Sequence, residues 1–392
     1  MMETKKLNIL FTTSHADTLG NACRLDMVKY LIDNFDATII TNQVDFVQNL
    51  FPNIDILPIY FKEIGKVPLV SDYRYWKCIA EKLNSIPSDG VFMFHDDSPA
   101  TIWTKKPVFQ YIHQYGTRAS DKSVSIKELF NRIFIKVKHQ LTIKGLRKTE
   151  INFVVSEFLI DYFQKEGLHN LELTPHAMEL KKFQKPLLNE NHQILSQLKN
   201  NGYFIITYTG WVTENRGFQL MMDSIKEVAS CDSKIILVIA GTDAIFSQRI
   251  IDFQKDNNLE SNIINYGIID ASLIPGILHY SDVCLSFLDD VPAFHVSPPQ
   301  KIFEYFAAGK PVICNMIQTH SHFIENGKTG YVLNMNYKEV SRAILLLRNN
   351  PELLKIMSVN AKKEAEKYEM KSVYGSMVEK IKIRLDELQK NS

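Results

Sequence analysis

The chain has 392 residues, of which 45% are hydrophobic and 23% charged, and its 45 Lys and Arg nearly balance 44 Asp and Glu for a net charge of +1. A single hydrophobic core stops growing near roughly 250–300 residues, so we expect two domains. The composition argues against a disordered or collagen-like chain, and the net charge argues against a nucleic-acid binder that relies on bulk charge.

Apolar stretches and cysteines predict a cytoplasmic protein. The longest apolar runs, near residues 90–94 and 235–240, are far shorter than the roughly 20 residues of a bilayer-spanning helix. Residues 1–11 contain no signal-peptide apolar region or small-residue cleavage site. The cysteines are scattered without C-x-x-C spacing, which indicates buried free thiols rather than a disulfide framework or a zinc site.

Short β-branched and aromatic segments alternate with longer amphipathic ones, as in parallel sheets whose strands are joined by helices. In the first half the predicted strands are residues 7–12, 37–41, 90–94, 108–112 and 151–155, with helices at 23–34 and 73–84. In the second half the predicted strands are residues 203–209, 235–240, 263–266, 283–287 and 311–314, with helices at 217–228, 245–257 and 299–308. Each half resembles a doubly wound, Rossmann-like α/β domain.

The two sets of predicted strands and helices indicate an N-terminal domain at residues 1–183 and a C-terminal domain at residues 184–369. A C-terminal helix within residues 370–392 is expected to cross back onto the first domain, and residues 181–202 read as a polar linker with a short helix. Open α/β sheets bind ligands beyond the carboxyl ends of their strands, so the cleft between the domains is the default ligand site.

The segment from Ser297 to residue 313 joins a proline-opened helix to a buried strand. Pro299 can begin a helix without losing a needed N–H group, and Gly309 can end it. Lys301 and Glu304 then share a helix face at i, i+3. One interpretation is a surface ion pair worth a few tenths of a kcal/mol. The other is a helix end that binds an anion, with Glu304 accepting hydrogen bonds from a diol such as a ribose.

Residues 297–313 read Ser-Pro-Pro-Gln-Lys-Ile-Phe-Glu-Tyr-Phe-Ala-Ala-Gly-Lys-Pro-Val-Ile. This run resembles the donor-site helix of retaining glycosyltransferases of family four, which have the GT-B fold, in the subgroup with Pro-x-Lys-x-x-Glu-Tyr. Further segments keep the family's order: residues 154–156 with 174–183, 208–217, 239–243, 266–267, 280–283 and 327–331. The resemblance is firm over residues 200–335 and looser over 7–183.

The resemblance implies a hexosyltransferase that uses a nucleoside diphosphate sugar, foremost a UDP-sugar, and needs no metal or other cofactor. The implied acceptor is a saccharide or a lipid-linked saccharide, with retention of configuration, in surface polysaccharide or glycoconjugate synthesis. The residues implied in donor binding are Gly20, Gly210, Gly241, Asp243, Gly267, Ser297 and Glu304. Those implied in catalysis are His113, Arg216 and Lys301.

Three positions depart from the family pattern. Val296 stands where a first glutamate is common, Trp211 where an arginine is common, and His322 where an acidic residue is common. We interpret Val296 as a mark of the subgroup, with Lys301 supplying compensating charge for the diphosphate. Two other functions stay open: another GT-B enzyme such as a nucleotide-sugar epimerase, and a catalytically degenerate partner subunit. No G-x-G-x-x-G follows either first strand, which argues against a nicotinamide dehydrogenase.

Several single residues have two interpretations. His113 follows a predicted strand, so it faces the cleft near the sugar or is a structural histidine, and we favour the cleft. For residues 95–97, His-Asp-Asp, we favour a helix cap over a place in the cleft. Gly20 lies either in a loop that approaches the donor or acceptor or in a flexible loop. His320 and His322 lack further ligands nearby, which argues against a metal.

Residues 121–150 carry eight Lys and Arg against three Asp and Glu, with apolar residues at helical spacing. A basic amphipathic helix at residues 125–148 can lie on an anionic membrane and bring the enzyme to a lipid-linked acceptor. Equally, it can pack its apolar stripe on the first domain and leave a solvated basic face.

Overall fold

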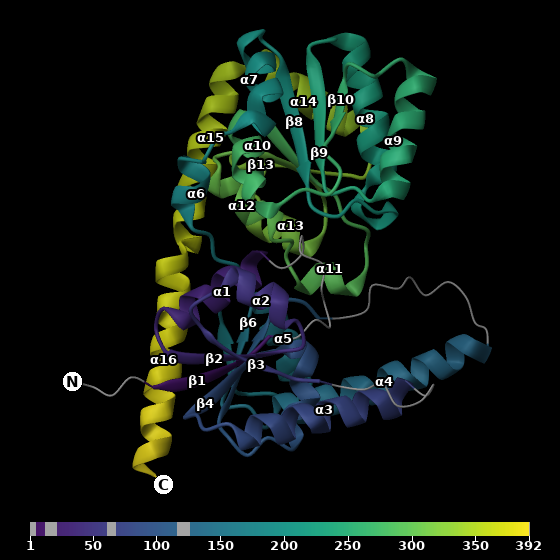
Figure 1. Ribbon diagram of the computed structural model, residues 1–392. Helices are drawn as coiled ribbons and strands as arrows, with labels where there is room; N and C mark the ends of the chain where they lie inside the picture. The colour runs from purple at the N-terminus through teal and green to yellow at the C-terminus, as the bar shows by residue number, and fades with distance from the viewer. Residues whose placement is uncertain (1–4, 12–21, 61–67, 116–125, 392) are drawn as a thin grey trace. The chain divides into compact units, whose positions relative to one another are not determined.

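The computed structural model describes residues 5–11, 22–60, 68–115 and 126–391, which fall into two compact units (Figure 1). Unit 1 contains the first strand, Arg24–Pro175 and the chain from Val373 onward. Unit 2 contains His176–Ser372. Each unit is built on one parallel sheet, as the sequence predicted.

The sheet of unit 1 has seven parallel strands in the order β3-β2-β1-β4-β5-β6-β7. Its strands are β1 (Lys6–Leu10), β2 (Asp36–Thr41), β3 (Asp55–Pro58), β4 (Gly90–Phe94), β5 (Val108–Ile112), β6 (Ile151–Val154) and β7 (Leu171–Leu173). The helices are α1 (Ala22–Ile32), α2 (Val44–Leu50), α3 (Pro68–Ser85), α4 (Ile126–Leu146), α5 (Glu157–Lys165) and the 3₁₀ helix η2 (His95–Ile102). Every residue of β4 and β5 is buried, as expected for central strands covered on both faces.

The sheet of unit 2 has six parallel strands in the order β10-β9-β8-β11-β12-β13. Its strands are β8 (Phe204–Thr209), β9 (Ile235–Ala240), β10 (Ile263–Asn265), β11 (Val283–Ser286), β12 (Val312–Asn315) and β13 (Gly330–Leu333). Its α-helices up to β11 are α6 (Leu180–Gln184), α7 (Gln193–Asn200), α8 (Phe218–Cys231), α9 (Ala244–Asn257) and α10 (Ile274–Tyr280). Those after β11 are α11 (Pro292–Val296), α12 (Lys301–Ala307), α13 (Gln318–Phe323), α14 (Tyr337–Asn349) and α15 (Pro351–Ala365).

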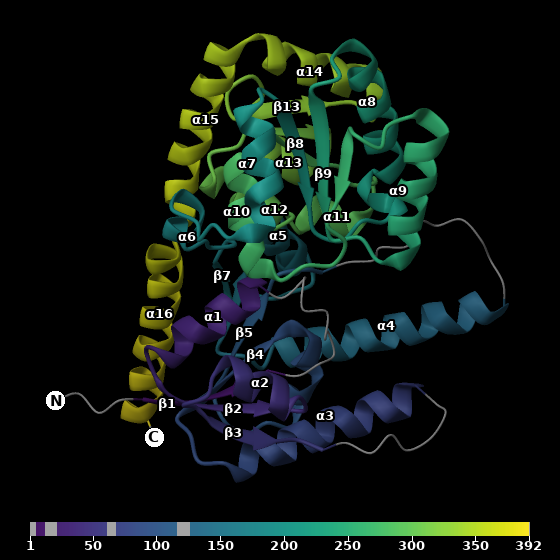
Figure 2. The same cartoon turned by 45° about the horizontal axis from the view of Figure 1, so that its top comes forward.

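The last helix, α16 (Met370–Lys390), belongs to unit 1 from Val373 onward. Tyr374 packs its ring edge-on against Tyr30 of α1, with 6.0 Å between ring centroids. Farther along, Arg384 donates two hydrogen bonds of 2.9 Å to the Glu150 carboxylate. The end of the chain thereby packs on the sheet with which the chain begins (Figure 2).

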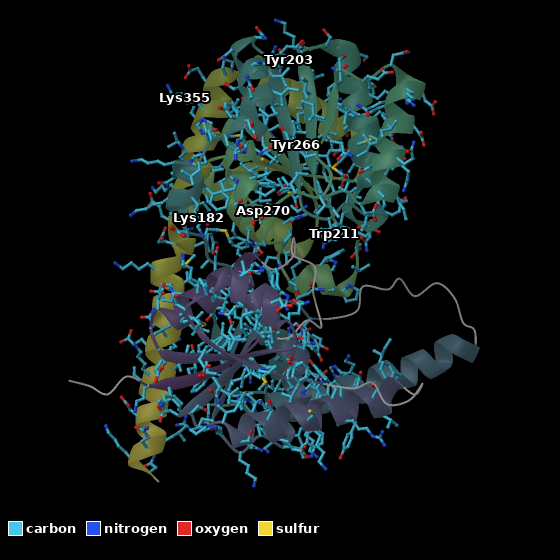
Figure 3. All side chains as sticks on the ribbon, in the orientation of Figure 1. Lys182, Tyr203, Trp211, Tyr266, Asp270 and Lys355 are labelled. Atoms are coloured by element: carbon cyan, nitrogen blue, oxygen red, sulfur yellow. The ribbon has the colours of Figure 1, made fainter. Side chains whose placement is uncertain are left out.

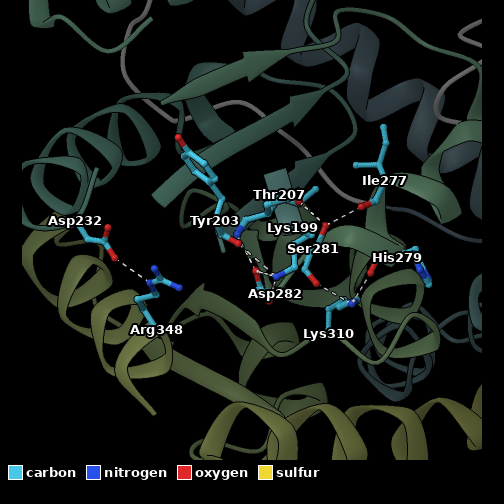
Figure 4. A network of polar contacts seen from close by, with 11 residues as sticks. Lys199, Tyr203, Thr207, Asp232, Ile277, His279, Ser281, Asp282, Lys310 and Arg348 are labelled. Atoms are coloured by element: carbon cyan, nitrogen blue, oxygen red, sulfur yellow. Dashed lines mark hydrogen bonds and ion pairs between the residues drawn. The ribbon is translucent and has the colours of Figure 1, made fainter. Parts of the chain in front are cut away.

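The amino-terminal edge of the unit 2 sheet is closed by charged side chains (Figure 4). Lys199 donates hydrogen bonds of 2.7 Å to both carboxylate oxygens of Asp282, which also accepts from the backbone of Ile205 in β8. Beside them, Arg348 of α14 donates to Asp232 at 2.9 Å. These contacts fix the ends of the strands farthest from the candidate site, so they serve the fold.

The sequence missed three strands, β3, β7 and β13, which lie at the edges of the two sheets. Each has only three or four residues and carries partly buried side chains, so the apolar signal is weak. The helix predicted at residues 299–308 is shorter in the structure: α12 begins at Lys301 and ends at Ala307. Within the described part of the chain, no helix is long and apolar enough to cross a membrane.

Candidate functional site

Glycines follow three neighbouring strands at the carboxyl edge of the unit 2 sheet. Gly210 follows β8, Gly241 follows β9, and Gly267 lies two residues beyond β10, with positive φ angles of 93°, 121° and 65°. The Gly210 amide donates to the Ala240 carbonyl at 2.8 Å, and the Gly241 amide donates to the Gly267 carbonyl at 2.7 Å. A Cβ on Gly241 would lie 2.3 Å from the Gly210 carbonyl oxygen, so only glycine permits this packing of turn on turn.

Two cations lie beside the Gly210 turn and share one aromatic ring. The Lys301 ammonium lies 3.4 Å from the centroid of the Tyr208 ring and 3.6 Å from where a Cβ on Gly210 would be. Arg216 hydrogen-bonds the Tyr208 hydroxyl, which itself donates to the Trp211 carbonyl at 2.8 Å. The arrangement places two positive groups at the carboxyl end of β8.

Burial shapes the protonation of both partners of this contact. Lys301 is only 7% exposed, and burial followed by the charge of Arg216 lowers its pKa well below the usual 10.5, against the opposing charge of Glu304. Burial raises the pKa of the Tyr208 phenol to about 12, so the ring stays neutral beneath the ammonium. Two positive groups that lie close together with little solvent repel each other, and a bound anion would offset that repulsion.

Arg216 ends the 3₁₀ helix η4 (Glu214–Arg216), which leads into α8. Its guanidinium carbon lies 5.6 Å from the centroid of the Phe294 ring on α11. The neighbouring Trp211, where the family commonly has an arginine, is half-buried in the same loop (Figure 3). Arg216 therefore supplies the basic group of this turn from five residues farther along.

Helix α12 is anchored to the sheet by a tyrosine that the sequence analysis did not single out. The Tyr305 hydroxyl accepts a hydrogen bond from the Thr209 amide at 3.0 Å and lies 3.3 Å from the Leu285 carbonyl of β11. Burial raises the pKa of this phenol well above 10, so it remains a neutral donor and acceptor. A tyrosine on the buried face of a helix needs a hydrogen-bond partner for its hydroxyl. Its place among the apolar residues of this helix could therefore have identified Tyr305 from the sequence.

Two residues predicted to bind the sugar donor, Ser297 and Glu304, lie at the end of α11 and within α12. Ser297 is buried and its amide donates to the Ala293 carbonyl at 3.1 Å, which ends α11. Glu304 is partly buried, and its carboxylate accepts a hydrogen bond of 2.8 Å from Gln300. Lys301, Arg216 and Gly210 are thus brought together, with Glu304 one turn farther along α12.

Asp243 serves as the N-cap of α9. Its carboxylate accepts a hydrogen bond of 2.8 Å from the Phe246 amide, so at least one oxygen has a structural partner. Beneath it, Thr242 donates to the Asn265 side chain at 2.6 Å, and the same Asn265 oxygen accepts from the Gly267 amide at 3.0 Å. These bonds hold the turns after β9 and β10 in register. Contact of Asp243 and Gly267 with a donor stays a prediction.

Two buried histidines support the same edge and were not assigned roles from the sequence. His176 lies 3.2 Å from the Pro298 carbonyl, and burial lowers its pKa to about 4. His320 lies 3.0 Å from the Ser286 hydroxyl at the end of β11, and burial lowers its pKa to about 4 as well. Both are neutral near pH 7. Among the described residues, no three His, Cys, Asp or Glu side chains are grouped to hold a metal ion.

His113 lies in unit 1, directly after β5. Arg24 of α1 lies 2.7 Å from its Nε2 atom and 3.1 Å from Asp96. The favoured cap for residues 95–97 is wrong: η2 begins after Phe94 without a side-chain cap, and Asp96 pairs with Arg24. Sequence reasoning missed Arg24, since one basic residue on an amphipathic helix carries no signal. Gly20 lies outside the described residues.

Comparisons with known proteins give this geometry a context. Residues 190–364 match the family described as Glycosyl transferases group 1. A curated Escherichia coli relative, UDP-Gal:alpha-D-GlcNAc-diphosphoundecaprenol alpha-1,3-galactosyltransferase, is 23% identical over 197 residues, which are 49% of this chain and 48% of the relative. The match thus spans about half the length of that relative.

Solved structures match over nearly the whole chain. Anabaena Alr3699/HepE, solved in complex with UDP and glucose, has a TM-score of 0.72 at 13% identity and covers 96% of this chain and 99% of its own. A glycosyltransferase from Rickettsia africae has a TM-score of 0.73 at 17% identity and covers 100% of both chains. The predicted fold is confirmed: the chain has the GT-B fold of these structures, and its residues 190–364 match the model of glycosyl transferases group 1.

Proposed function

We propose that this protein is a glycosyltransferase that moves a sugar from a UDP-sugar to a saccharide or lipid-linked saccharide acceptor with retention of configuration. Its place would be the synthesis of a surface polysaccharide or glycoconjugate. The observation that carries the proposal is the pair of cations beside the Gly210 turn: Lys301 lies over the face of the Tyr208 ring, and Arg216 hydrogen-bonds its hydroxyl. The group 1 family match covers these residues.

The paired cations suit a diphosphate leaving group. When the bond between sugar and phosphate breaks, negative charge grows on the phosphate oxygen. Fixed positive groups therefore stabilise the transition state more than they stabilise the ground state. Lys301 and Arg216 would supply this stabilisation because burial and the aromatic contacts hold them in place. Charge from the side chains makes a metal ion unnecessary, so metal independence is part of the proposal.

The remaining donor contacts follow from the same edge of the sheet. The absence of a side chain at Gly210 would let the phosphates approach the backbone beside Lys301, although the Gly210 and Gly241 amides themselves are bonded to carbonyls of the neighbouring turns. Glu304, one helical turn from Lys301, would accept hydrogen bonds from the ribose hydroxyls. A uracil base is favoured because the E. coli relative is named for UDP-Gal and the Anabaena structure holds UDP.

Contact with an anionic membrane is a second part of the proposal. The segment from residue 134 to residue 148, which comprises the later part of α4 (Figure 1) and its continuation, carries several lysines and is termed the basic arm. Lys138 joins the arm to α3, since it pairs with Asp72 at 3.5 Å and lies 5.7 Å from the Trp76 ring centroid. Ile135 and Val137 remain 50% and 37% exposed. Exposed apolar side chains among lysines are typical of helices that bind a membrane surface.

One screen tests the donor. Purified protein is heated with UDP-, GDP-, dTDP- and ADP-sugars, since a ligand raises the unfolding temperature of the state that it binds. We expect a UDP-sugar to give the largest shift. Lys301→Met should abolish the shift. Lys355 is an exposed lysine on α15, and the control variant Lys355→Met should keep the shift. No shift with any nucleotide sugar would contradict the proposal.

A second experiment separates the competing functions. The donor from the screen is incubated with candidate saccharide and lipid-linked acceptors, and products are followed by mass spectrometry and by NMR of the anomeric proton. Transfer with the donor's anomeric configuration supports a retaining transferase, and an inverted product would refute retention. An epimerised donor without transfer would identify an epimerase, and binding without turnover against every acceptor would favour a degenerate partner subunit.

A further inference from the structure

The two central strands of the unit 2 sheet, β8 and β11, part before either of them ends. Their last pair in register is Thr207 with Cys284. Both strands nevertheless run on, β8 to Thr209 and β11 to Ser286. On its other side β8 stays paired with β9 along its whole length, and β11 stays paired with β12 to its last residue. The separation is therefore confined to the line between β8 and β11.

A tyrosine hydroxyl takes the place of the next backbone hydrogen bond between these strands. Continued in the same register, a parallel ladder would join the Thr209 amide to the Leu285 carbonyl. Instead the Tyr305 hydroxyl bridges them: it accepts from the Thr209 amide at 3.0 Å and donates to the Leu285 carbonyl at 3.3 Å. An amide N–H only donates and a carbonyl only accepts, so the direction of both bonds is settled.

The bridge lies where a sheet of this class binds its ligands. From β8 the chain builds one side of the sheet through β9 to β10, and from β11 it builds the other side through β12 to β13. Open α/β sheets bind ligands at the carboxyl ends of the two strands between which this direction reverses. In unit 2 these strands are β8 and β11, so Tyr305 keeps apart the strand ends that border the expected crevice.

The same hydroxyl connects the two groups that form the candidate donor site. Gly210 follows Thr209 directly, at the end of β8. Lys301 lies one turn before Tyr305 on α12. The Lys301 ammonium lies 3.6 Å from where a Cβ on Gly210 would be and 3.4 Å from the centroid of the Tyr208 ring. The bond from the Thr209 amide to Tyr305 therefore ties the helix that carries Lys301 to the turn beside it.

Packing alone does not account for a tyrosine at this position. Tyr305 is fully buried in a cluster that includes the apolar side chains of Ile302, Phe303 and Phe306. A phenylalanine would bury the same ring there without a polar group that needs partners. The hydroxyl is thus the part of Tyr305 that apolar packing leaves unexplained, and the bridge between β8 and β11 is what it adds.

We infer that Tyr305 is a positioning residue whose hydroxyl replaces one backbone hydrogen bond between β8 and β11 and thereby sets Lys301 beside the Gly210 turn. The inference rests on the proposed function, in which Lys301 binds the donor diphosphate. Because Tyr305 is fully buried, it acts on the donor only through Lys301 and the Gly210 turn.

The first test needs no ligand. Tyr305→Phe keeps the ring between the strands and removes only the hydroxyl, so the Thr209 amide loses its acceptor. We expect hydrogen exchange of this amide, followed by NMR, to be at least about fivefold faster than in the wild type. The pKa of Lys301, followed through its ¹³Cε signal, should move toward the usual 10.5 as water reaches the displaced ammonium. Tyr203→Phe removes a hydroxyl beside the opposite end of β8 (Figure 4) and should change neither readout.

Unchanged exchange at Thr209 in Tyr305→Phe, or an unchanged pKa of Lys301, would overturn the inference. Should Tyr305→Phe fail to fold, a crystal structure of the wild type decides: a direct hydrogen bond from Thr209 to Leu285 would overturn the inference, and a hydroxyl bonded to both would support it. These readouts are taken on ligand-free protein. They stand even if no nucleotide sugar binds, a result that would remove only the proposed function.

Titration calorimetry with UDP supplies the second test. Tyr305→Phe should weaken UDP binding by at least about fivefold, because a misplaced ammonium loses part of a charge-assisted hydrogen bond. In the Lys301→Gln background the same change should weaken binding by less than about twofold, since its effect passes through Lys301. A tyrosine that served only the fold would weaken binding alike in both backgrounds, and equal losses would overturn the inference.

Discussion

The Lys301 ammonium lies 3.4 Å from the centroid of the Tyr208 ring. Arg216 hydrogen-bonds the hydroxyl of the same ring, so one aromatic side chain contacts two positive groups, one over its face and one at its hydroxyl. The negative face of the ring attracts the Lys301 ammonium, typically by about 0.5–2 kcal/mol, and so offsets part of the repulsion between the two cations. A bound anion, such as the diphosphate of the proposed donor, would relieve the remainder.

The lowered pKa of Lys301 predicts a pH-dependent affinity for UDP. Burial keeps this pKa well below 10.5 in the free protein, and a bound diphosphate raises it, so binding takes up a proton at alkaline pH. The dissociation constant for UDP should therefore rise with pH, by up to about tenfold per pH unit above the free-state pKa. Titration calorimetry in buffers of different ionisation enthalpy measures both the affinity and the proton uptake.

Lys301→Arg is the matched control for this dependence. Arginine keeps its charge throughout the accessible pH range, so the variant should bind UDP with little change in affinity between neutral and alkaline pH. Lys301→Gln should bind weakly at every pH. An equal pH dependence in the wild type and in Lys301→Arg would contradict the role of Lys301.

Glu304 is predicted to bind the ribose of the donor. Glu304→Ala should weaken UDP-sugar binding and lower turnover by at least about tenfold, because a hydrogen bond to a charged group contributes about 1.5–3 kcal/mol. Glu339→Ala, which removes a partly buried carboxylate of α14, should change neither. Calorimetry with a 2′-deoxyribose analogue gives a sharper test: the wild type should discriminate against it and Glu304→Ala should not. Near wild-type donor affinity in Glu304→Ala would refute this role.

The glycine turns predict a graded loss of stability. Gly202→Ala places a side chain at a φ of 79° with open space around it, so it should lower the free energy of unfolding by about 1 kcal/mol. Gly241→Ala adds a contact of 2.3 Å with the Gly210 carbonyl oxygen, and we expect a loss above about 2 kcal/mol. Urea unfolding compares the two variants. Equal losses would mean that the turns can separate at little cost.

The sequence predicted the architecture because central parallel strands are continuous apolar runs, as in β8 and β9. It also singled out Lys301 and Arg216, which lie together beside Tyr208, because both occur in local motifs that resemble those of a known family. It missed contacts made by residues far apart in the chain. Tyr305 reaches Thr209 across 96 positions, and Arg24 reaches His113 across 89 positions. Such pairs depend on which strands lie side by side, and no local pattern encodes that.

The basic arm predicts binding to anionic membranes. Each exposed lysine near such a surface adds about 1 kcal/mol, so replacing both Lys136 and Lys144 by glutamine should lower partition into anionic vesicles by roughly thirtyfold. Ile135→Ser with Val137→Ser should also reduce binding, because these exposed side chains would enter the interface. Cosedimentation with vesicles of phosphatidylglycerol and phosphatidylcholine measures both effects.

The control for the basic arm removes an equal charge elsewhere. Lys226, Lys255 and Lys355 are exposed lysines on helices of unit 2, and any two of them replaced by glutamine should leave vesicle binding unchanged. Added salt should weaken vesicle binding by the wild type toward the level of the Lys136 and Lys144 double variant, because salt screens exposed charges. If both double variants sediment alike, general charge attraction explains the binding. If the wild type does not sediment at low salt, the exposed face of α4 serves a purpose other than membrane contact.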